Sequence, residues 1–363
     1  VAAAARYAQD PHVAWAQASF AVSADLAAND PYLASSGSWV QPYADLWGIL
    51  RVRAPEAWDV SLGDGILVAV NDTGIDVQHP DLAANVWLNP GEDLDGNGAA
   101  DPTDFNGVDD DANGFVDDLN GFDFANSVDA NGDGDFDDPG DLSDPDPFDD
   151  FGHGTHVAGT IAAVANNGIG VAGVAPRALV MAVKGLRASG STPDSVLARA
   201  MVYAADNGAR VINNSWSCST RCPSNPVVEE AQAYAASLGV VVVTSAGNRS
   251  DDVVFYSPKP RRDNIVVGAT DDRDRPAVFT NTGFLVSAVA PGSGTPNVPG
   301  IDLSQRAILS TLSSGAGLDA HGGGRFVVGD DYLRWVGTSM SAPHVAGIAA
   351  LVLARHPDYT PDD

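Results

Sequence analysis

The feature that most restricts the fold of this chain is the alternation, from residue 61 onward, of short runs rich in Val, Ile and Leu with longer helical segments. Runs that are apolar throughout are typical of strands buried on both faces of a sheet. Strands of this kind, separated by helices, predict a doubly wound α/β fold, in which a mainly parallel sheet carries helices on both faces. The predicted strands are residues 65–70, 179–183, 210–213, 240–243 and 265–267, with a further strand at 13–22, and the predicted helices are residues 47–58, 153–165, 195–207, 227–238 and 340–355.

The balance of charge restricts the partners. The 363 residues include 19 Lys and Arg against 48 Asp and Glu, which gives a formal net charge of −29. Nucleic acids and anionic membrane surfaces attract basic proteins, so neither is expected to bind this chain. No apolar stretch reaches the roughly 18 residues that a membrane-spanning helix needs. The charge favours a cationic partner, and small metal cations are the simplest candidates.

Most of the acid lies in one segment, residues 92–150, which holds 21 Asp and Glu and no Lys, Arg or His. The segment interrupts the step from the strand near Val70 to the helix near His153, so we interpret it as an insertion. It contains three copies of the pattern D-x-[DN]-x-[DN]-G, which begin at Asp93, Asp109 and Asp129. The repeat separates this segment from an ordinary acidic loop.

The repeated pattern predicts calcium-binding loops. Oxygen ligands at positions 1, 3 and 5 converge on one point, and the Gly at position 6 permits the sharp turn. Hard oxygen ligands without His or Cys favour Ca²⁺. In the first copy an acid also stands at positions 9 and 12, whereas the other two copies have Asn120 and Gly140 at position 12, so they lack the closing acid. The candidate ligands are Asp93, Asp95, Asn97, Asp101, Asp104, Asp109, Asp111, Asn113, Asp117, Asp129, Asn131, Asp133 and Asp137.

The alternative for this segment is a solvated, disordered acidic linker. Three copies of the pattern, and six Phe residues that a solvated linker would not need, favour the metal. No pair of helices flanks these loops in the sequence pattern, so we expect calcium-binding loops that are not true EF-hands.

Three short segments carry the residue types of a catalytic site for nucleophilic acyl transfer. Asp72 ends the first buried run, His153 opens a predicted helix, and Ser339 opens the last predicted helix. A fourth segment ends a strand with the side-chain amide of Asn248, which can donate a hydrogen bond to a developing oxyanion. A Ser at a helix start is by itself more often a cap. The four groups together, each at the end of an element, favour catalysis.

These segments resemble the boxes of the subtilisin-like serine protease family, the subtilases. The second segment reads HGTHVAGT from His153 and the third reads GTSMSAPHVAG from Gly337, in the family's order Asp, His, Ser. The resemblance implies that Ser339 is the nucleophile and His153 the general base. It also implies that Asp72 orients the imidazole, and that Asn248 and the Ser339 backbone N–H form the oxyanion hole.

The resemblance has further implications. Residues 1–25 would be the tail of an inhibitory propeptide, and residues 26–363 a catalytic domain that is cut short at its C-terminal end and includes the insertion at 92–150. A peptide substrate would pair with two exposed edges, which are Leu186, Arg187, Ala188, Ser189 and Gly190 on one side and Ser215, Trp216 and Ser217 on the other. The protein would be a secreted monomer that binds polypeptide substrates and its own propeptide.

Two questions stay open at this stage. Cys218 and Cys222 are either two free thiols or a short-loop disulfide; an extracellular setting and the lack of any other Cys favour the disulfide. The second question is whether the fold is catalytic at all. An inactive calcium-binding adhesion or scaffold protein on a subtilase fold is the alternative to a secreted serine endopeptidase.

Overall fold

The computed structural model describes residues 28–128, 142–256, 264–292, 307–317 and 324–363. Within these ranges the centre of the molecule is an eight-stranded sheet of order β3-β2-β4-β1-β5-β6-β7-β8. Strand β3 is antiparallel to β2, and the other seven strands are parallel, so the predicted mainly parallel sheet is confirmed. The strands are β1 Leu67–Asp72, β2 Gly121–Val128, β3 Leu142–Asp144, β4 Leu179–Lys184, β5 Val211–Asn214, β6 Val241–Ser245, β7 Asn264–Thr270 and β8 Ala288–Pro291. The predicted strand at 13–22 lies outside the described residues.

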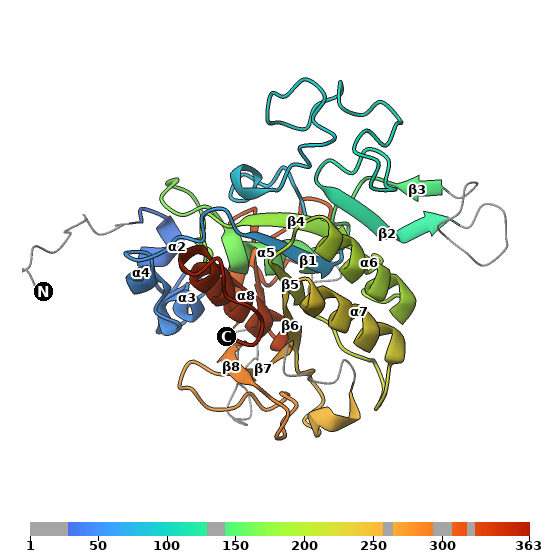
Figure 1. Cartoon of the computed structure of the whole chain (residues 1–363). Helices are drawn as coiled ribbons and strands as arrows, with labels where there is room; N and C mark the ends of the chain where they lie inside the picture. Colours follow the sequence, from blue (N-terminus) through green and yellow to red (C-terminus); the bar gives the residue numbers. More distant parts are fainter. Residues whose placement is uncertain (1–27, 129–141, 257–263, 293–306, 318–323) are drawn as a thin grey trace, which may run out of the picture.

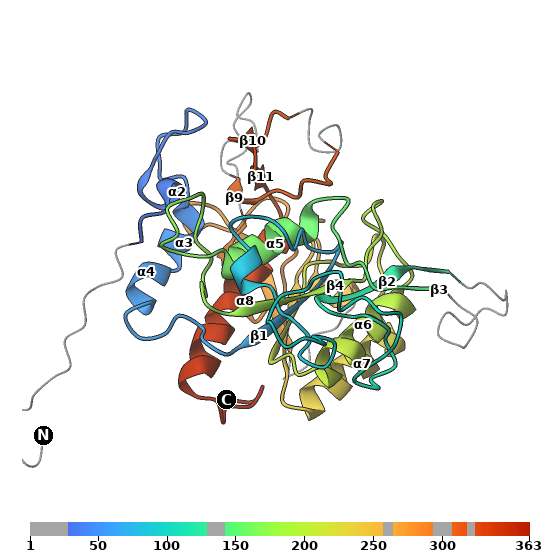
Figure 2. The same ribbon diagram turned by 90° about the horizontal axis from the view of Figure 1, so that it is seen from above.

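Helices cover both faces of this sheet (Figure 1, Figure 2). Helices α5 (His153–Ala162) and α8 (Thr338–Arg355) pack on one face, and α6 (Asp194–Asp206) and α7 (Pro226–Ser237) pack on the other. The predicted helix at 47–58 is two short helices, because Arg53 adopts a left-handed conformation with φ 59°. The remaining elements are α2 Pro31–Ala34, α3 Trp47–Arg51, α4 Ala54–Ala57, the 3₁₀ turns Ala83–Asn85 and Val253–Phe255, and a three-stranded sheet of β9 Ile308–Thr311, β10 Val327–Val328 and β11 Tyr332–Trp335. No helix in the described ranges is both long enough and apolar enough to span a bilayer.

The two faces of each central strand serve different cores, which explains the unbroken apolar runs. In β1, Val68 and Val70 belong to the core under α5 and α8, while Leu67 and Ala69 belong to the core under α6 and α7. All six residues of β1 are buried. A strand with one exposed face would instead alternate apolar and polar residues.

The order of the strands places a topological switch point at the carboxyl ends of β1 and β4. The chain builds β4 on one side of β1 and then returns to build β5 on the other side. The connection after β1 passes through α5 on one face of the sheet, and the connection after β4 passes through α6 on the other face, so the loops that follow these two strands separate at this point. Ligand sites of doubly wound sheets form at such positions. Asp72, the last residue of β1, lies here.

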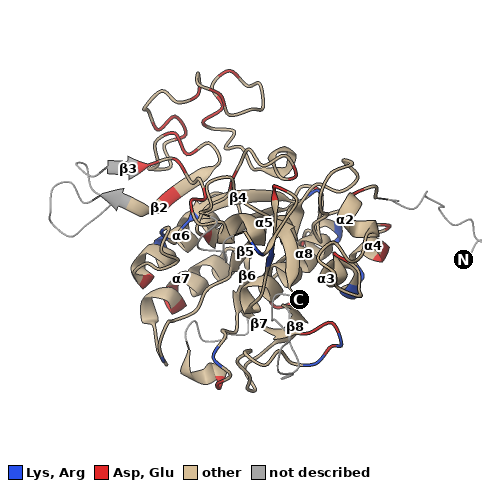
Figure 3. Ribbon diagram, turned by 180° about the vertical axis from the view of Figure 1, so that it is seen from behind, with Lys and Arg blue, Asp and Glu red and all other residues tan. Residues whose placement is uncertain are grey.

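The acidic segment projects from the β2–β4 end of the sheet, with its Asp and Glu side chains spread over the loops (Figure 1, Figure 3). It is anchored by aromatic packing, because Phe115, Phe122 and Phe124 form ring contacts with one another and with Tyr203 of α6 at centroid distances of 4.8–6.3 Å. Its β2 strand pairs in parallel with β4 and so belongs to the main sheet, which the sequence did not predict. The segment is therefore joined to the body by both a strand and a side-chain cluster.

Candidate active site

Asp72 and His153 form a hydrogen-bonded pair at the carboxyl end of β1. Asp72 is fully buried, and His153, the first residue of α5, lies with its Nδ1 2.7 Å from Asp72 Oδ1. An ionised carboxylate only accepts hydrogen bonds, so Nδ1 carries the proton and Nε2 is left as the basic nitrogen of the neutral ring. The His153 side chain is 14% exposed. It can therefore meet a bound molecule.

The start of α5 is fixed by a buried carboxylate that the sequence analysis missed. Asp149 is fully buried and accepts five hydrogen bonds, none of them longer than 3.1 Å. The donors are the backbone N–H groups of Phe151, Gly152 and Thr155 and the hydroxyls of Thr73 and Thr155. Thr73 follows Asp72, so Asp149 ties the segment of the acid to the segment of the imidazole.

The pKa of His153 is shifted by this environment. Burial lowers the pKa of the imidazole, but the charge of Asp72 and the hydrogen bond to it outweigh burial, so the pKa is raised above its ordinary value. The charge of Asp149 adds to this increase. The cationic form that a general base reaches after taking a proton is therefore stabilised at this position.

Ser339 lies at the start of α8, where it is paired with Ser215. The Ser339 hydroxyl donates to the Ser215 carbonyl at 2.8 Å, and the Ser215 hydroxyl donates to the Ser339 carbonyl at 2.8 Å. Ser215 follows β5, the neighbour of β1. The reciprocal bonds thus hold the start of α8 against the carboxyl edge of the sheet.

Asn248 follows β6 and is held by the residue before Ser339. Its Oδ1 accepts from the Thr338 backbone N–H at 2.8 Å and from the Thr338 hydroxyl at 2.9 Å, so its Nδ2 is the end of the amide left to donate. A Cβ built on Gly337 would lie 3.4 Å from Asn248 Nδ2 and 3.6 Å from the Ser339 N. One point beside Gly337 therefore lies near both the side-chain donor and the backbone donor.

Aromatic side chains link the pair Asp72–His153 to the segments around Ser339. The Trp335 ring, two residues before Gly337, meets the His153 ring edge-on at a centroid distance of 5.1 Å. Trp216 Nε1 donates to the Asn71 carbonyl at 3.1 Å. The structure thus brings the four predicted residues to one edge of the sheet, although the Ser339 hydroxyl here bonds to Ser215 and not to the imidazole.

Comparison with known protein families agrees with this arrangement. The model of the subtilase family, Peptidase_S8, matches residues 63–363. The chain belongs to the subtilase family. The predicted family is therefore confirmed, and with it, at the level of the family, the predicted class of serine proteases.

Individual relatives support the same conclusion. A thermophilic serine proteinase of Bacillus sp. (strain AK1) is 33% identical over 95% of this chain, which spans 64% of that relative's length. Thermitase of Thermoactinomyces vulgaris is 31% identical over 90% of this chain and 85% of its own. Among solved structures, a protease from Pseudoalteromonas arctica PAMC 21717 is 31% identical and superposes with a TM-score of 0.61, covering 92% of this chain and 89% of that one.

The two predicted substrate edges of this subtilase flank the site. Leu186 donates its backbone N–H to the Asp72 carbonyl at 2.8 Å, which places the first edge beside the acid. In the described part of the chain, the backbone N–H groups of Ala188, Ser189 and Ser217 have no hydrogen-bond partner. The carbonyl groups of an extended peptide substrate can accept hydrogen bonds from unpaired backbone N–H groups of this kind. The Arg187 side chain, in contrast, is bound to the Ala125 carbonyl of β2.

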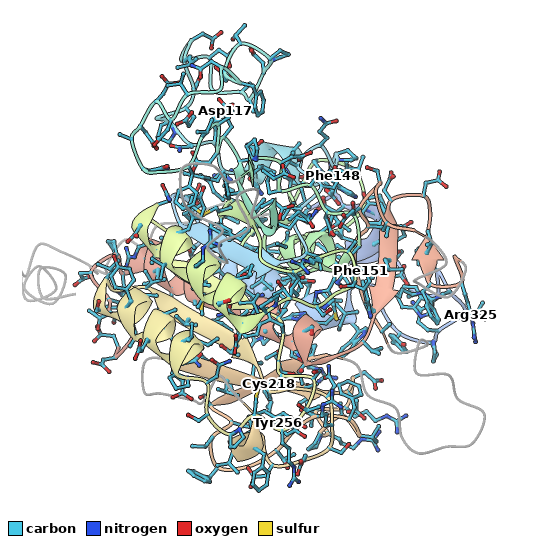
Figure 4. The ribbon with its side chains drawn as sticks, turned by 90° about the vertical axis from the view of Figure 1, so that its right-hand side faces the viewer. Asp117, Phe148, Phe151, Cys218, Tyr256 and Arg325 are labelled. Atoms are coloured by element: carbon cyan, nitrogen blue, oxygen red, sulfur yellow. A yellow bond between two sulfur atoms is a disulfide. The ribbon has the colours of Figure 1, made fainter. Side chains whose placement is uncertain are left out.

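A disulfide joins Cys218 and Cys222, directly after the second edge. The Cys222 N–H donates to the Phe255 carbonyl at 2.9 Å, and Arg221 pairs with Asp251. Figure 4 labels Cys218 and Tyr256 in this region, at the end of the molecule away from Asp117 and the projecting acidic loops. The bridge therefore closes the loop after the second edge, while Arg221 and the Cys222 backbone N–H tie that loop to the segment around residues 251–256.

Some of the predicted metal ligands lie close enough together to share an ion, and others do not. Two groups of carboxylates have ligand atoms within 4.8 Å of one another, namely Asp93 with Asp95 and Asp104, and Glu92 with Asp109 and Asp111. Asp101 instead binds Thr103 and Asn97, Asp117 binds the N–H groups of Asn106 and Gly107, and Asn113 donates its amide to Asp111 and Asp118. The predicted ligands Asp129, Asn131, Asp133 and Asp137 lie outside the described residues. Sequence reasoning missed Glu92.

Proposed function

We propose that this chain is the catalytic part of a secreted serine endopeptidase that hydrolyses polypeptides and is stabilised by calcium. The observation that carries the proposal is the Asp72–His153 pair at the carboxyl end of β1, beside the segments that hold Ser339 and Asn248. An inactive scaffold has no need of a partly exposed imidazole that is paired with a buried carboxylate, so we favour the enzyme.

The first step is the attack of Ser339 on the scissile carbonyl carbon. The Ser339 hydroxyl leaves the Ser215 carbonyl and turns its proton toward His153 Nε2. As the bond from Oγ to carbon forms, the proton passes to Nε2 and the carbonyl becomes an oxyanion. Asp72 stabilises the imidazolium through the Nδ1–H bond and does not itself take the proton.

The oxyanion forms beside Gly337, where Asn248 Nδ2 and the Ser339 N–H can both donate to it. The Oδ1 of Asn248 is already bound to Thr338, so the amide is oriented before the charge develops. Little free energy is then needed to reorient it during the reaction. When the tetrahedral intermediate collapses, His153 returns the proton to the leaving amine. Water then repeats the sequence on the acyl-enzyme and restores the Ser339 hydroxyl.

The substrate is proposed to bind as a strand between the edges at 186–190 and 215–217. The free backbone groups of these edges give affinity that does not depend on the substrate sequence. This arrangement suits a polypeptide better than a small ester. We also propose that residues 1–25 are the tail of an inhibitory propeptide, that 26–363 form the catalytic domain, and that the enzyme works as a secreted monomer.

Calcium is proposed to stabilise the acidic segment. In the described part of 92–150 the carboxylates outnumber the cations that reach them, and the salt bridges there are those of Lys184 to Asp123 and Asp150. The loop around Asp93, Asp95 and Asp104 offers oxygen ligands close enough together for one ion. Calcium bound there would offset the repulsion among the carboxylates and has no part in the chemical steps.

The test of the nucleophile is the Ser339→Ala variant, assayed on casein and on a peptide ester. We expect hydrolysis to fall below detection. The matched control is Ser341→Ala, on the same helix, since the buried Ser341 hydroxyl has no hydrogen-bond partner in the described residues. Undiminished hydrolysis by Ser339→Ala would refute the assignment, and the chain would then be a hydrolase with another nucleophile.

A further inference from the structure

Glu92 is the one Glu among the 21 acids of residues 92–150, and it is not part of any D-x-[DN]-x-[DN]-G repeat. Its side chain is fully buried. Oε1 accepts from the backbone N–H of Asp110 at 2.9 Å and from that of Asp111 at 3.4 Å. Oε2 is buried and has no hydrogen-bond partner in the described residues. A buried carboxylate oxygen without a partner is costly unless another ligand satisfies it.

The Glu92 carboxylate belongs to a cluster. Ligand atoms of Glu92, Asp109 and Asp111 lie within 4.8 Å of one another. Ca²⁺ binds oxygens at about 2.3–2.6 Å, so atoms separated by up to about twice that length can touch one ion. In the described part of the chain no Lys, Arg or His forms an ion pair with any of the three. The cluster thus combines negative charge, hard oxygen ligands and an unsatisfied buried acceptor.

The surrounding residues hold the cluster in place. A Cβ on Gly91 would lie 2.3 Å from the Asp111 Cβ, so the turn before Glu92 and the loop of Asp111 are in direct contact. Asn89 Nδ2 donates to Asp111 Oδ2 at 2.9 Å and to Asp118 Oδ1 at 2.8 Å. The approach of Glu92 to the loop is therefore built into the packing of both segments.

We propose that Glu92, Asp109 and Asp111 form a calcium site in which Glu92 supplies, from before the loop, the closing carboxylate that the loop lacks. Position 12 of this second loop is Asn120, whose side-chain amide donates to the Trp87 carbonyl at 2.8 Å and cannot close the loop as a bidentate acid would. Glu is one methylene longer than Asp and suits a ligand that reaches in from a neighbouring turn. The proposal rests on the calcium role proposed above and is independent of the proteolytic chemistry.

The test counts calcium ions in the Ser339→Ala background, which prevents self-digestion. Chains stripped with chelator are dialysed against CaCl₂, the bound calcium is measured by elemental analysis, and the affinities are measured by titration calorimetry. Glu92→Gln is expected to lose one ion per chain, or to bind it at least tenfold more weakly. The matched control Glu230→Gln changes an exposed Glu on α7 and is expected to bind as the parent does. Asp95→Asn, in the first loop, is expected to lose a different ion, so that the double variant loses two.

The outcomes separate this proposal from the one it rests on. If the parent binds calcium and Glu92→Gln binds the same number with the same affinities, Glu92 is not a ligand and the present proposal fails alone. If the parent binds no calcium, the calcium role itself fails. Should Glu92→Gln not fold, Glu92→Asp decides the question, because it keeps the charge and withdraws the carboxylate by one methylene. Weaker binding at one site supports the proposal, and unchanged binding overturns it.

Discussion

Replacing Asp149 by Asn tests whether a buried carboxylate positions His153. All five hydrogen-bond partners of Asp149 are donors. Burial raises the pKa of Asp149, and the hydrogen bonds from Gly152 and Thr155 oppose this increase. Three of these partners are backbone N–H groups, which can only donate, so the ionised form, which accepts all five bonds, is the one that fits. Asn keeps the shape but replaces one acceptor oxygen by an NH₂ group that can only donate.

The loss of stability follows from the geometry. If the NH₂ group takes the place of Oδ2, the Thr155 backbone N–H loses its acceptor; if it takes the place of Oδ1, those of Phe151 and Gly152 lose theirs. Thr hydroxyls can turn to accept from the amide, but backbone N–H groups cannot. A buried donor left without a partner costs about 1–3 kcal/mol, so Asp149→Asn is expected to lower the free energy of unfolding by at least that amount.

Activity gives a second measurement that a purely structural role would not change in the same way. The charge of Asp149 contributes to the raised pKa of His153. The acid limb of the kcat/KM profile is therefore expected to move to lower pH in Asp149→Asn, while kcat falls because α5 is less firmly held. Stability is measured by urea unfolding in the Ser339→Ala background, and kinetics are measured in the active enzyme.

The matched control is Asp150→Asn, which removes the neighbouring carboxylate. The Asp150 side chain is 43% exposed and pairs with Lys184 at 3.4 Å. The buried Lys184 keeps its other partners, Asp123 and the Phe148 carbonyl, so this variant is expected to change stability less than Asp149→Asn does. Equal stability and an unshifted pH profile for Asp149→Asn would refute the positioning role.

Four further predictions concern the site and the acidic segment. Asn248→Ala should lower kcat by about 10²–10³ with little change in KM, a range known from loss of one such donor in a subtilisin; an unchanged kcat would exclude Asn248 from the oxyanion hole. The acid limb of the kcat/KM profile should have its midpoint above about 6.5, because the general base must be neutral and the pKa of His153 is raised; a midpoint below that value would contradict the pairing with Asp72. Gly154→Ala should cost about 1–3 kcal/mol and lower kcat, since its Cβ would lie 2.1 Å from the Gly74 carbonyl oxygen; circular dichroism melting and ester hydrolysis measure the two effects, and a variant like the parent in both would argue against this close packing. EDTA should lower the melting temperature of the Ser339→Ala chain relative to excess Ca²⁺, and identical melting curves would count against stabilisation by calcium.

The sheet could be predicted because its central strands are apolar on both faces. The limits of β1 show what this signal misses: the predicted strand was 65–70, whereas the observed strand is Leu67–Asp72. It begins later because Gly65 is in a turn with φ +75°, and it continues through the polar residues Asn71 and Asp72. Polar residues at the end of a buried strand look like a loop in sequence, although here they are the part of the strand that reaches the site.

Strand β2 was not predicted because its polar residues resemble the loops around it. Phe122 and Phe124 enter the core, but Asp123 between them is also buried, at 1% exposure, and lies 3.5 Å from Lys184 of β4. A buried acid is tolerated here because a Lys that is far away in the sequence pairs with it, and that pairing cannot be predicted from the local sequence. The alternation of Phe122 and Phe124 was the available signal.

The candidate catalytic residues could be predicted because each stands in a distinctive box, whereas their support could not. Asp149 acts through Thr73 and Thr155, which meet only when β1 and α5 are packed together. Glu92 similarly meets Asp109 and Asp111 through a turn of the chain. Each of these residues was unusual in its place: Asp149 is a carboxylate four residues before a helical His, and Glu92 is a lone Glu among Asp residues. Their partners, however, depend on the fold.

Mapping the site of a serine-directed fluorophosphonate tests the central claim most directly. The active protein is treated until hydrolysis of a peptide ester stops, and the modified residue is then located by mass spectrometry of peptides. A single phosphonate on Ser339, in proportion to the loss of activity and absent from a His153→Ala variant, is the predicted result. Complete inactivation with the label on any other residue would contradict the account.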